Sequence, residues 1–152
     1  RKSLLSNSNP YTPAVNLVFA LDESLKMMRE EGLEGIFLRH HKHKMAMSNA
    51  AKALNLKLFA DEKFLSPSIT AIKTEEMDAE EFRKIIKNKY DILLAGGQDH
   101  LKGKIFRVGH LGYINDRDII TIISAIGNTL FDLGKITAKQ AGEALVVASK
   151  YL

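Results

Sequence analysis

Apolar residues recur at helical spacing in five stretches of this chain and alternate with polar residues in four shorter ones. The stretches with helical spacing are 15–32, 33–54, 78–89, 115–134 and 137–151. The stretches typical of strands are 56–60, 68–74, 90–95 and 104–112. Asp78, Asn115 and Thr137 stand at the starts of the last three helices, where their side chains can cap free backbone N–H groups.

The elements follow one another in the order helix, helix, two strands, helix, two strands, helix, helix. This order predicts an α+β domain with a small, mostly antiparallel sheet of about four strands. We expect helices packed on one face of the sheet and long helices at both ends of the chain. Gly96-Gly97, after the third strand, lacks the spacing of a phosphate-binding loop, and we interpret it as a turn.

The fourth strand, KIFRVGHLG from Lys104 to Gly112, carries one arginine between apolar residues. Burying Arg107 is costly unless its guanidinium meets a carboxylate or a phosphate. That partner could be an internal aspartate or glutamate, which the spacing alone favours, or the carboxylate of a ligand. The sequence pattern leaves both interpretations open.

Thr12 and Pro13 lie just ahead of the helix that begins near Val15. Free backbone N–H groups and a hydroxyl at such a place suit a phosphate. A plain helix cap explains the same pattern, and the local sequence favours it.

The composition is that of an ordinary globular protein, with 45% hydrophobic and 26% charged residues. The net charge is +4, but an acidic stretch from Asp61 to Glu81 separates the basic stretches of the chain. This alternation favours a mixed, solvated surface over a nucleic-acid interface. The absence of cysteine excludes disulfides and thiolate metal sites and fits a reducing cytoplasm, where we expect the protein. No apolar run approaches the ~20 residues of a membrane-spanning helix.

The run HHKHK from His40 to Lys44 has the residue types of a metal site. Zinc-binding pairs on a helix place histidines at i and i+4, but the residue four after His40 is a lysine. No carboxylate lies close by in sequence. We therefore expect no metal site here.

Two separated parts of the sequence resemble one known family. Residues 10–59 (PYTPAVNLVFA to NLKLF) are similar to the start of the C-terminal domain of class V pyridoxal-phosphate aminotransferases, and the alanine–glyoxylate and serine–pyruvate branch is most similar. GGQDHLKGKIFRVGHLG, with the following NDRDIITIISAIGNTL, resembles the end of that domain. The two motifs occur in the same order as in the family.

The resemblance implies roles for individual residues. Arg107 corresponds to the arginine that binds the substrate's α-carboxylate. Thr12 corresponds to a threonine that reaches across a homodimer to the cofactor phosphate of the other subunit. Some relatives have a tyrosine three residues before that threonine; Asn9 stands there in this chain, and Tyr11 is a weaker substitute.

The resemblance also implies how the chain is organised. Residues 1–14 would be a linker from a missing upstream large domain, 15–134 the aminotransferase C-terminal domain, and 135–152 a C-terminal helix. The lysine that attaches pyridoxal 5'-phosphate, and the aspartate that pairs with its ring nitrogen, would lie upstream. No catalytic residue is therefore expected in this fragment, and the fragment alone is expected to be inactive.

The implied reaction transfers an amino group between a small amino acid of the alanine or serine type and a 2-oxo acid of the pyruvate or glyoxylate type. The expected partners are these substrates, the upstream domain and a second subunit, with no nucleic acid and no membrane. Some relatives are named as a small subunit of a soluble hydrogenase, which we interpret as a name for the same fold. The alternative is a free-standing basic α+β module that binds nucleic acid or a protein partner. Against it, aromatic residues make up only 7% of the chain, and no strand offers a stacking platform for bases.

Overall fold

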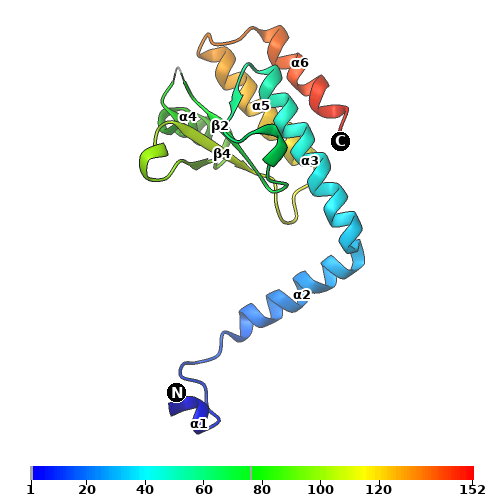
Figure 1. Cartoon of the computed structure of the whole chain (residues 1–152), viewed down its shortest axis with the longest axis vertical. Helices are drawn as coiled ribbons and strands as arrows, with labels where there is room; N and C mark the ends of the chain where they lie inside the picture. The colour runs from blue at the N-terminus through cyan, green and yellow to red at the C-terminus, as the bar shows by residue number, and fades with distance from the viewer. Residues whose placement is uncertain (1, 76) are drawn as a thin grey trace. The chain divides into compact units, whose positions relative to one another are not determined.

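The computed structural model describes residues 2–75 and 77–152, and the chain divides into two compact units, 1–37 and 38–152 (Figure 1). The first unit holds α1 (Lys2–Leu5), α2 (Val15–Glu31) and the first turn of α3 (Leu33–Ala53). Gly32 ends α2 with a φ of 77°, and its N–H donates to the Met28 carbonyl. A left-handed φ at the end of a helix suits glycine, which has no Cβ to clash. The two long N-terminal helices predicted from the sequence are therefore confirmed.

No residue of α2 is buried. Its exposed large apolar residues are Val15, Leu17, Val18, Phe19, Leu21, Leu25, Met27 and Met28. A run of eight such side chains on one helix is more than the scattered apolar residues found on ordinary protein surfaces.

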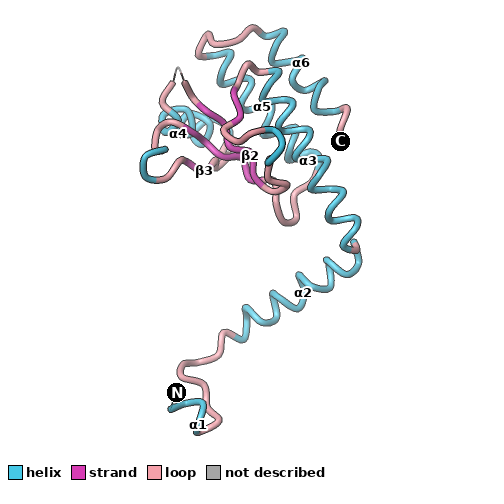
Figure 2. Tube along the Cα trace, in the orientation of Figure 1, coloured by secondary structure: helices cyan, strands magenta, loops and turns pink. Residues whose placement is uncertain are grey.

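The second unit is built on a four-stranded sheet, whose strands are magenta in Figure 2. The strand order is β1-β2-β4-β3, and every neighbouring pair is antiparallel. The strands are β1 (Lys57–Leu58), β2 (Ile69–Lys73), β3 (Ala95–Gly96) and β4 (Ile105–Gly109). The two central strands have five residues each, whereas the edge strands have two. The predicted α+β fold with a small antiparallel sheet is confirmed.

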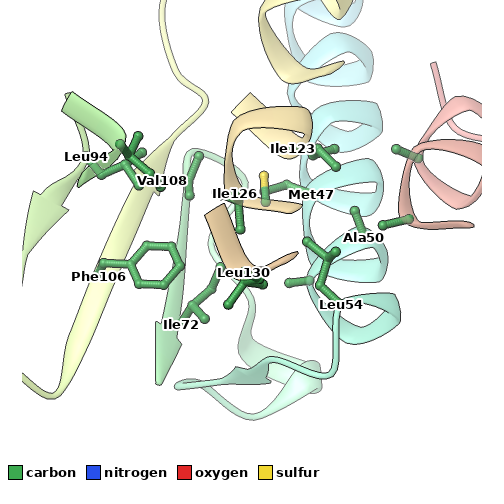
Figure 3. Packing of buried hydrophobic residues seen from close by; sticks show 14 of the residues in the cluster. Met47, Ala50, Leu54, Ile72, Leu94, Phe106, Val108, Ile123, Ile126 and Leu130 are labelled. Atoms are coloured by element: carbon green, nitrogen blue, oxygen red, sulfur yellow. The ribbon is translucent and has the colours of Figure 1, made fainter. Parts of the chain in front are cut away.

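Helices cover one face of this sheet. They are the remainder of α3, then α4 (Ala79–Tyr90), α5 (Asp116–Asp132) and α6 (Ala138–Ser149). Figure 3 shows Ile126 and Leu130 of α5 between Phe106 of the sheet and Met47 of α3, in one buried cluster. On the opposite side of the central strands, Ile105 is buried, whereas the other residues are half-buried or exposed: Ile69, Ala71, Lys73, Arg107 and Gly109. Because side chains alternate along a strand, these residues lie on the face that the helices leave open.

The helices pack closely because small residues lie at their contacts. A Cβ added to Gly127 of α5 would lie 3.4 Å from the side chain of Leu54, just after α3, and 3.5 Å from the Cβ of Ala141 of α6. On the other side of the core, the rings of Phe82 and Phe106 lie with centroids 5.1 Å apart, which ties α4 to β4.

The three predicted caps are present. The Asp78 side chain accepts from the N–H groups of Glu80 and Glu81. Asn115 forms a capping box with Asp118, and Thr137 forms one with Gln140. Each cap of this kind stabilises a helix by about 1 kcal/mol, so these boundaries are fixed locally.

The predicted third strand, 90–95, is wrong in its extent. Helix α4 continues through Tyr90, and Asp91 ends it in a left-handed conformation with a φ of 54°. Only Ala95 and Gly96 then pair with β4, opposite Arg107 and Phe106. Gly96 is consequently part of β3, so the interpretation of Gly96-Gly97 as a turn is also wrong.

Across residues 2–75 and 77–152, no helix is both long and apolar enough to cross a bilayer.

Candidate functional site

Arg107 is the third residue of β4 and is half-buried on the open face of the sheet. The register places it between Ala71 of β2 and Ala95 of β3. Two small neighbours leave room for the arginine stem to lie along the sheet. Phe59 extends the same row beyond β2, because its N–H donates to the Ala71 carbonyl.

The guanidinium of Arg107 has one protein partner in the part of the chain that is described. Its Nε donates to the Gly96 carbonyl at 3.0 Å. No carboxylate of residues 2–75 and 77–152 forms an ion pair with it. The internal acidic partner that the sequence pattern favoured is therefore not found among these residues. The two terminal nitrogens remain available for a planar anion with two acceptor oxygens.

Thr12, Tyr11 and Asn9 belong to the first unit, and Arg107 belongs to the second. Thr12, Tyr11 and Asn9 all lie in the exposed loop that precedes α2. The N-cap of that helix is Ala14, which offers no side-chain hydrogen bond, so Thr12 is not the cap. This overturns the local interpretation of Thr12 as a plain helix cap and leaves its hydroxyl exposed.

The histidine-rich run contributes to packing. His43 of α3 is buried, and its Nε2 lies 2.9 Å from an Asp116 carboxylate oxygen at the start of α5. Among the described residues, no group of three or more histidine, aspartate or glutamate side chains is placed to hold a metal ion.

His110 is a buried group that sequence reasoning missed. It follows β4 directly, and its two ring nitrogens lie 3.1 Å from the Pro67 carbonyl and 2.8 Å from the Thr70 hydroxyl. Burial lowers the pKa of His110 from 6.5 to about 4, and the nearby His43 and His40 add to the effect. The sequence shows a histidine between glycine and leucine there, with no sign that β2 would enclose it.

A cleft of about 360 Å³ lies at the end of β2, away from Arg107. Its lining combines apolar residues with the charged residues Lys57, Lys73, Glu75 and Lys135. Lys57 and Glu75 form an ion pair at 2.6 Å. Arg107 does not line the cleft, so the cleft is separate from the site around Arg107.

Searches by sequence find relatives that match nearly the whole chain. It is 52% identical over 134 residues to a protein of Anabaena cylindrica named as the 42 kDa subunit of a soluble hydrogenase. It is 39% identical over 134 residues to an uncharacterized aminotransferase of Methanocaldococcus jannaschii. It is 32% identical over 145 residues to a serine–glyoxylate aminotransferase of Arabidopsis thaliana. The matches cover 88%, 88% and 94% of this chain, but only 35%, 34% and 36% of those proteins.

Solved structures agree with these matches. The ureidoglycine–glyoxylate aminotransferase of Bacillus subtilis superposes with a TM-score of 0.84 at 29% identity, over 92% of this chain and 37% of that one. The pyridoxamine–pyruvate aminotransferase of Mesorhizobium loti superposes with a TM-score of 0.86 at 27% identity, over 94% and 37%. No protein-family model matches the chain. The chain spans about a third of the length of the curated relatives that it matches.

Proposed function

Because this chain is homologous to class V aminotransferases over about a third of their length, we propose that it is the C-terminal part of one. The whole enzyme would transfer an amino group between a small amino acid and a small 2-oxo acid. The proposal is carried by one observation about Arg107. This arginine is half-buried on the open face of the sheet and has no acidic partner among the described residues.

In this proposal Arg107 binds the carboxylate that amino-acid and 2-oxo-acid substrates share. A guanidinium presents two parallel N–H donors, which match the two oxygens of a carboxylate. The Gly96 carbonyl holds Nε, so the terminal nitrogens can serve the substrate. Binding at this end of the substrate orients its α-carbon and thereby contributes to rate.

The names of the relatives indicate the substrate type. The Arabidopsis relative is named for serine and glyoxylate, and the two solved structures are named for glyoxylate and pyruvate. We infer an acceptor of this type, a 2-oxo acid of two or three carbons, and a donor of the serine or alanine type.

The family implies pyridoxal 5'-phosphate, and this chain offers peripheral contacts to it. Thr12 has an exposed hydroxyl just before α2, where a helix N-terminus suits a phosphate. Asn9 and Tyr11 are exposed in the same loop and could add donors. When bound, the cofactor carries the amino group and stabilises the charge that develops at the substrate's α-carbon. We assign the lysine that attaches it to the upstream large domain.

The exposed apolar side chains of α2 are evidence for an upstream large domain. Eight large apolar side chains on one helix form a surface that needs a partner. The relatives are about two and a half times as long as this chain, so they contain enough additional sequence for a large domain. We propose that this domain covers α2 and that Thr12 serves the cofactor of a second subunit in a homodimer.

The comparisons do not support a free-standing basic module that binds nucleic acid. Two relatives carry a hydrogenase name, which points to another chemistry, but the chain has no cysteine and so offers no thiolate ligand to a metal cluster. Their matches cover 88% and 100% of this chain, and the match to the Arabidopsis aminotransferase covers 94%.

An assay of the full-length protein tests the proposal. Purified with pyridoxal 5'-phosphate, it is expected to convert glyoxylate to glycine with serine or alanine as donor, and to show the absorbance of bound cofactor. The reason is that the family supplies the cofactor chemistry and Arg107 the substrate contact. Cofactor binding without turnover of any amino-acid donor would contradict the proposal.

The 152-residue chain by itself is expected to be inactive. None of its lysines lies in a motif that matches the family's cofactor-attaching lysine. Incubation with pyridoxal 5'-phosphate and borohydride, followed by mass spectrometry, checks this. Stoichiometric labelling of one lysine in this chain would show that the attachment point lies here.

A further inference from the structure

We propose that Gly96, which lies against the Arg83–Glu80 ion pair of α4, positions Arg107 for the substrate's carboxylate. This inference rests on the proposed function. It adds two elements, α4 and β3, that the resemblance does not assign to the site.

The first contact lies between β3 and β4. The Arg107 Nε donates to the Gly96 carbonyl at 3.0 Å. A hydrogen bond at Nε restricts rotation of the whole guanidinium, because Nε is the atom through which the planar group joins its stem. The direction of Nη1 and Nη2 is therefore set by where the Gly96 carbonyl lies.

The second contact lies between α4 and Leu94, the residue just before β3. The Arg83 Nε donates to the Leu94 carbonyl at 2.7 Å. The Arg83 Nη1 lies 2.8 Å and 2.7 Å from the two carboxylate oxygens of Glu80, one turn earlier on the same helix. Arg83 is thus fixed at both Nε and Nη1, and it holds the chain two residues before Gly96.

Gly96 lies directly against this ion pair. A Cβ on Gly96 would be 2.5 Å from Arg83 Nη1 and 2.5 Å from Glu80 Oε1, closer than real Cβ contacts. The ends of flexible side chains can usually give way, but here Arg83 is anchored through Nε to the Leu94 carbonyl and Glu80 is bonded to Arg83 Nη1. Any side chain at position 96 therefore displaces the ion pair, the strand or both.

Strand β3 has little else to hold it. It has two residues, lies at the edge of the sheet and pairs only with β4. Arg83 of α4 holds the Leu94 carbonyl just before the strand, and Arg107 of β4 holds the Gly96 carbonyl within it. Just after the strand, the Gly97 N–H donates to the Ile105 carbonyl. A shift of this short segment consequently moves the carbonyl that orients Arg107.

Gly96→Ala in the full-length enzyme tests the inference, and Gly142→Ala is the matched control. Gly142 is an exposed residue of α6, and a Cβ added to it would meet nothing within 4 Å, so the same substitution there is harmless. We expect Gly96→Ala to raise KM for both amino-acid and 2-oxo-acid substrates about 10-fold or more, the order for a small misplacement at a binding group. Cofactor content is expected to stay at the wild-type level. An unchanged KM would overturn the proposal.

A second variant covers the case in which Gly96→Ala folds poorly. Arg83→Met keeps an unbranched side chain of similar length and removes both contacts, to Leu94 and to Glu80. We expect KM to rise in the same direction, and Arg83→Lys not to restore it, because lysine has no donor at the position of Nε. Normal KM in Arg83→Met would contradict the inference.

Two further measurements separate this inference from the proposed function. In an enzyme that already carries Arg107→Lys, adding Gly96→Ala is expected to raise KM little further, because both substitutions act through one guanidinium. Fully additive effects of the two substitutions on the free energy of substrate binding would overturn the proposal. A crystal structure of Gly96→Ala is expected to show the Arg107–Gly96 hydrogen bond broken, and an intact bond would overturn it whether or not the enzyme turns over. If wild-type enzyme is inactive, the proposed function fails. If only Arg107→Lys impairs catalysis, the positioning role fails alone.

Discussion

Arg107→Lys in the full-length enzyme is expected to lower kcat/KM for amino- and 2-oxo-acid substrates by roughly 2–4 kcal/mol, the order for breaking a buried charge pair. Lysine keeps the positive charge but replaces a planar fork with a point charge. It cannot hold the Gly96 carbonyl, as Arg107 Nε does, and also meet both oxygens of a carboxylate. The substrate would therefore lose orientation as well as affinity, which affects rate.

Thr12→Ala is the matched variant for this prediction. It is expected to weaken cofactor binding and to spare the substrate KM measured at saturating cofactor, because Thr12 lies in the loop assigned to the phosphate. Kinetics and melting temperature should be measured on the same preparations. If Arg107→Lys lowers the melting temperature but leaves kcat/KM per folded molecule unchanged, Arg107 is structural and the site assignment is wrong.

The helices could be predicted from the sequence because their ends are decided locally. Asp78, Asn115 and Thr137 cap their own helices, and Gly32 ends α2, so each boundary depends on a few neighbouring residues. The extent of β3 could not be predicted. It depends on which residues reach β4 after Asp91 reverses the chain, and that pairing joins residues far apart in sequence.

The candidate site likewise has one part that the local sequence indicates and another that only the tertiary fold determines. An arginine within a run of strand-forming residues identifies Arg107 as unusual without any structure. Its partner, the Gly96 carbonyl, is a backbone atom that every residue has, so no residue type marks it. Arg83 and Glu80 look like an ordinary surface pair three residues apart on a helix. Only the tertiary fold shows that Gly96 lies against them.

Acidification is expected to destabilise this domain through His110. The Pro67 carbonyl can only accept, so Nδ1 of His110 carries the hydrogen and Nε2 accepts from the Thr70 hydroxyl. Protonating Nε2 removes that acceptor and places a charge in a buried site near His43 and His40. Burial, the largest cause, therefore lowers the pKa of His110 to about 4, against 6.5 for an ordinary histidine.

The sign of the effect follows from proton uptake. Between pH 6.5 and about 4, the unfolded chain protonates this histidine and the folded chain does not. The unfolded state then binds more protons, so stability is complete above pH 6.5 and falls as the pH drops toward 4. The difference between a pKa of 6.5 in the unfolded chain and about 4 in the folded chain corresponds to about 3 kcal/mol in the free energy of unfolding.

His110→Asn isolates this contribution. Asparagine does not titrate, and its amide can still donate to the Pro67 carbonyl. The variant is expected to be less stable at neutral pH but to lose less stability than wild type between pH 6.5 and about 4, as measured by urea unfolding at several pH values. His100→Asn, a change at an exposed histidine, is the control and should follow the wild-type curve. If His110→Asn and wild type lose stability in parallel, His110 is not the group that makes this domain sensitive to acid.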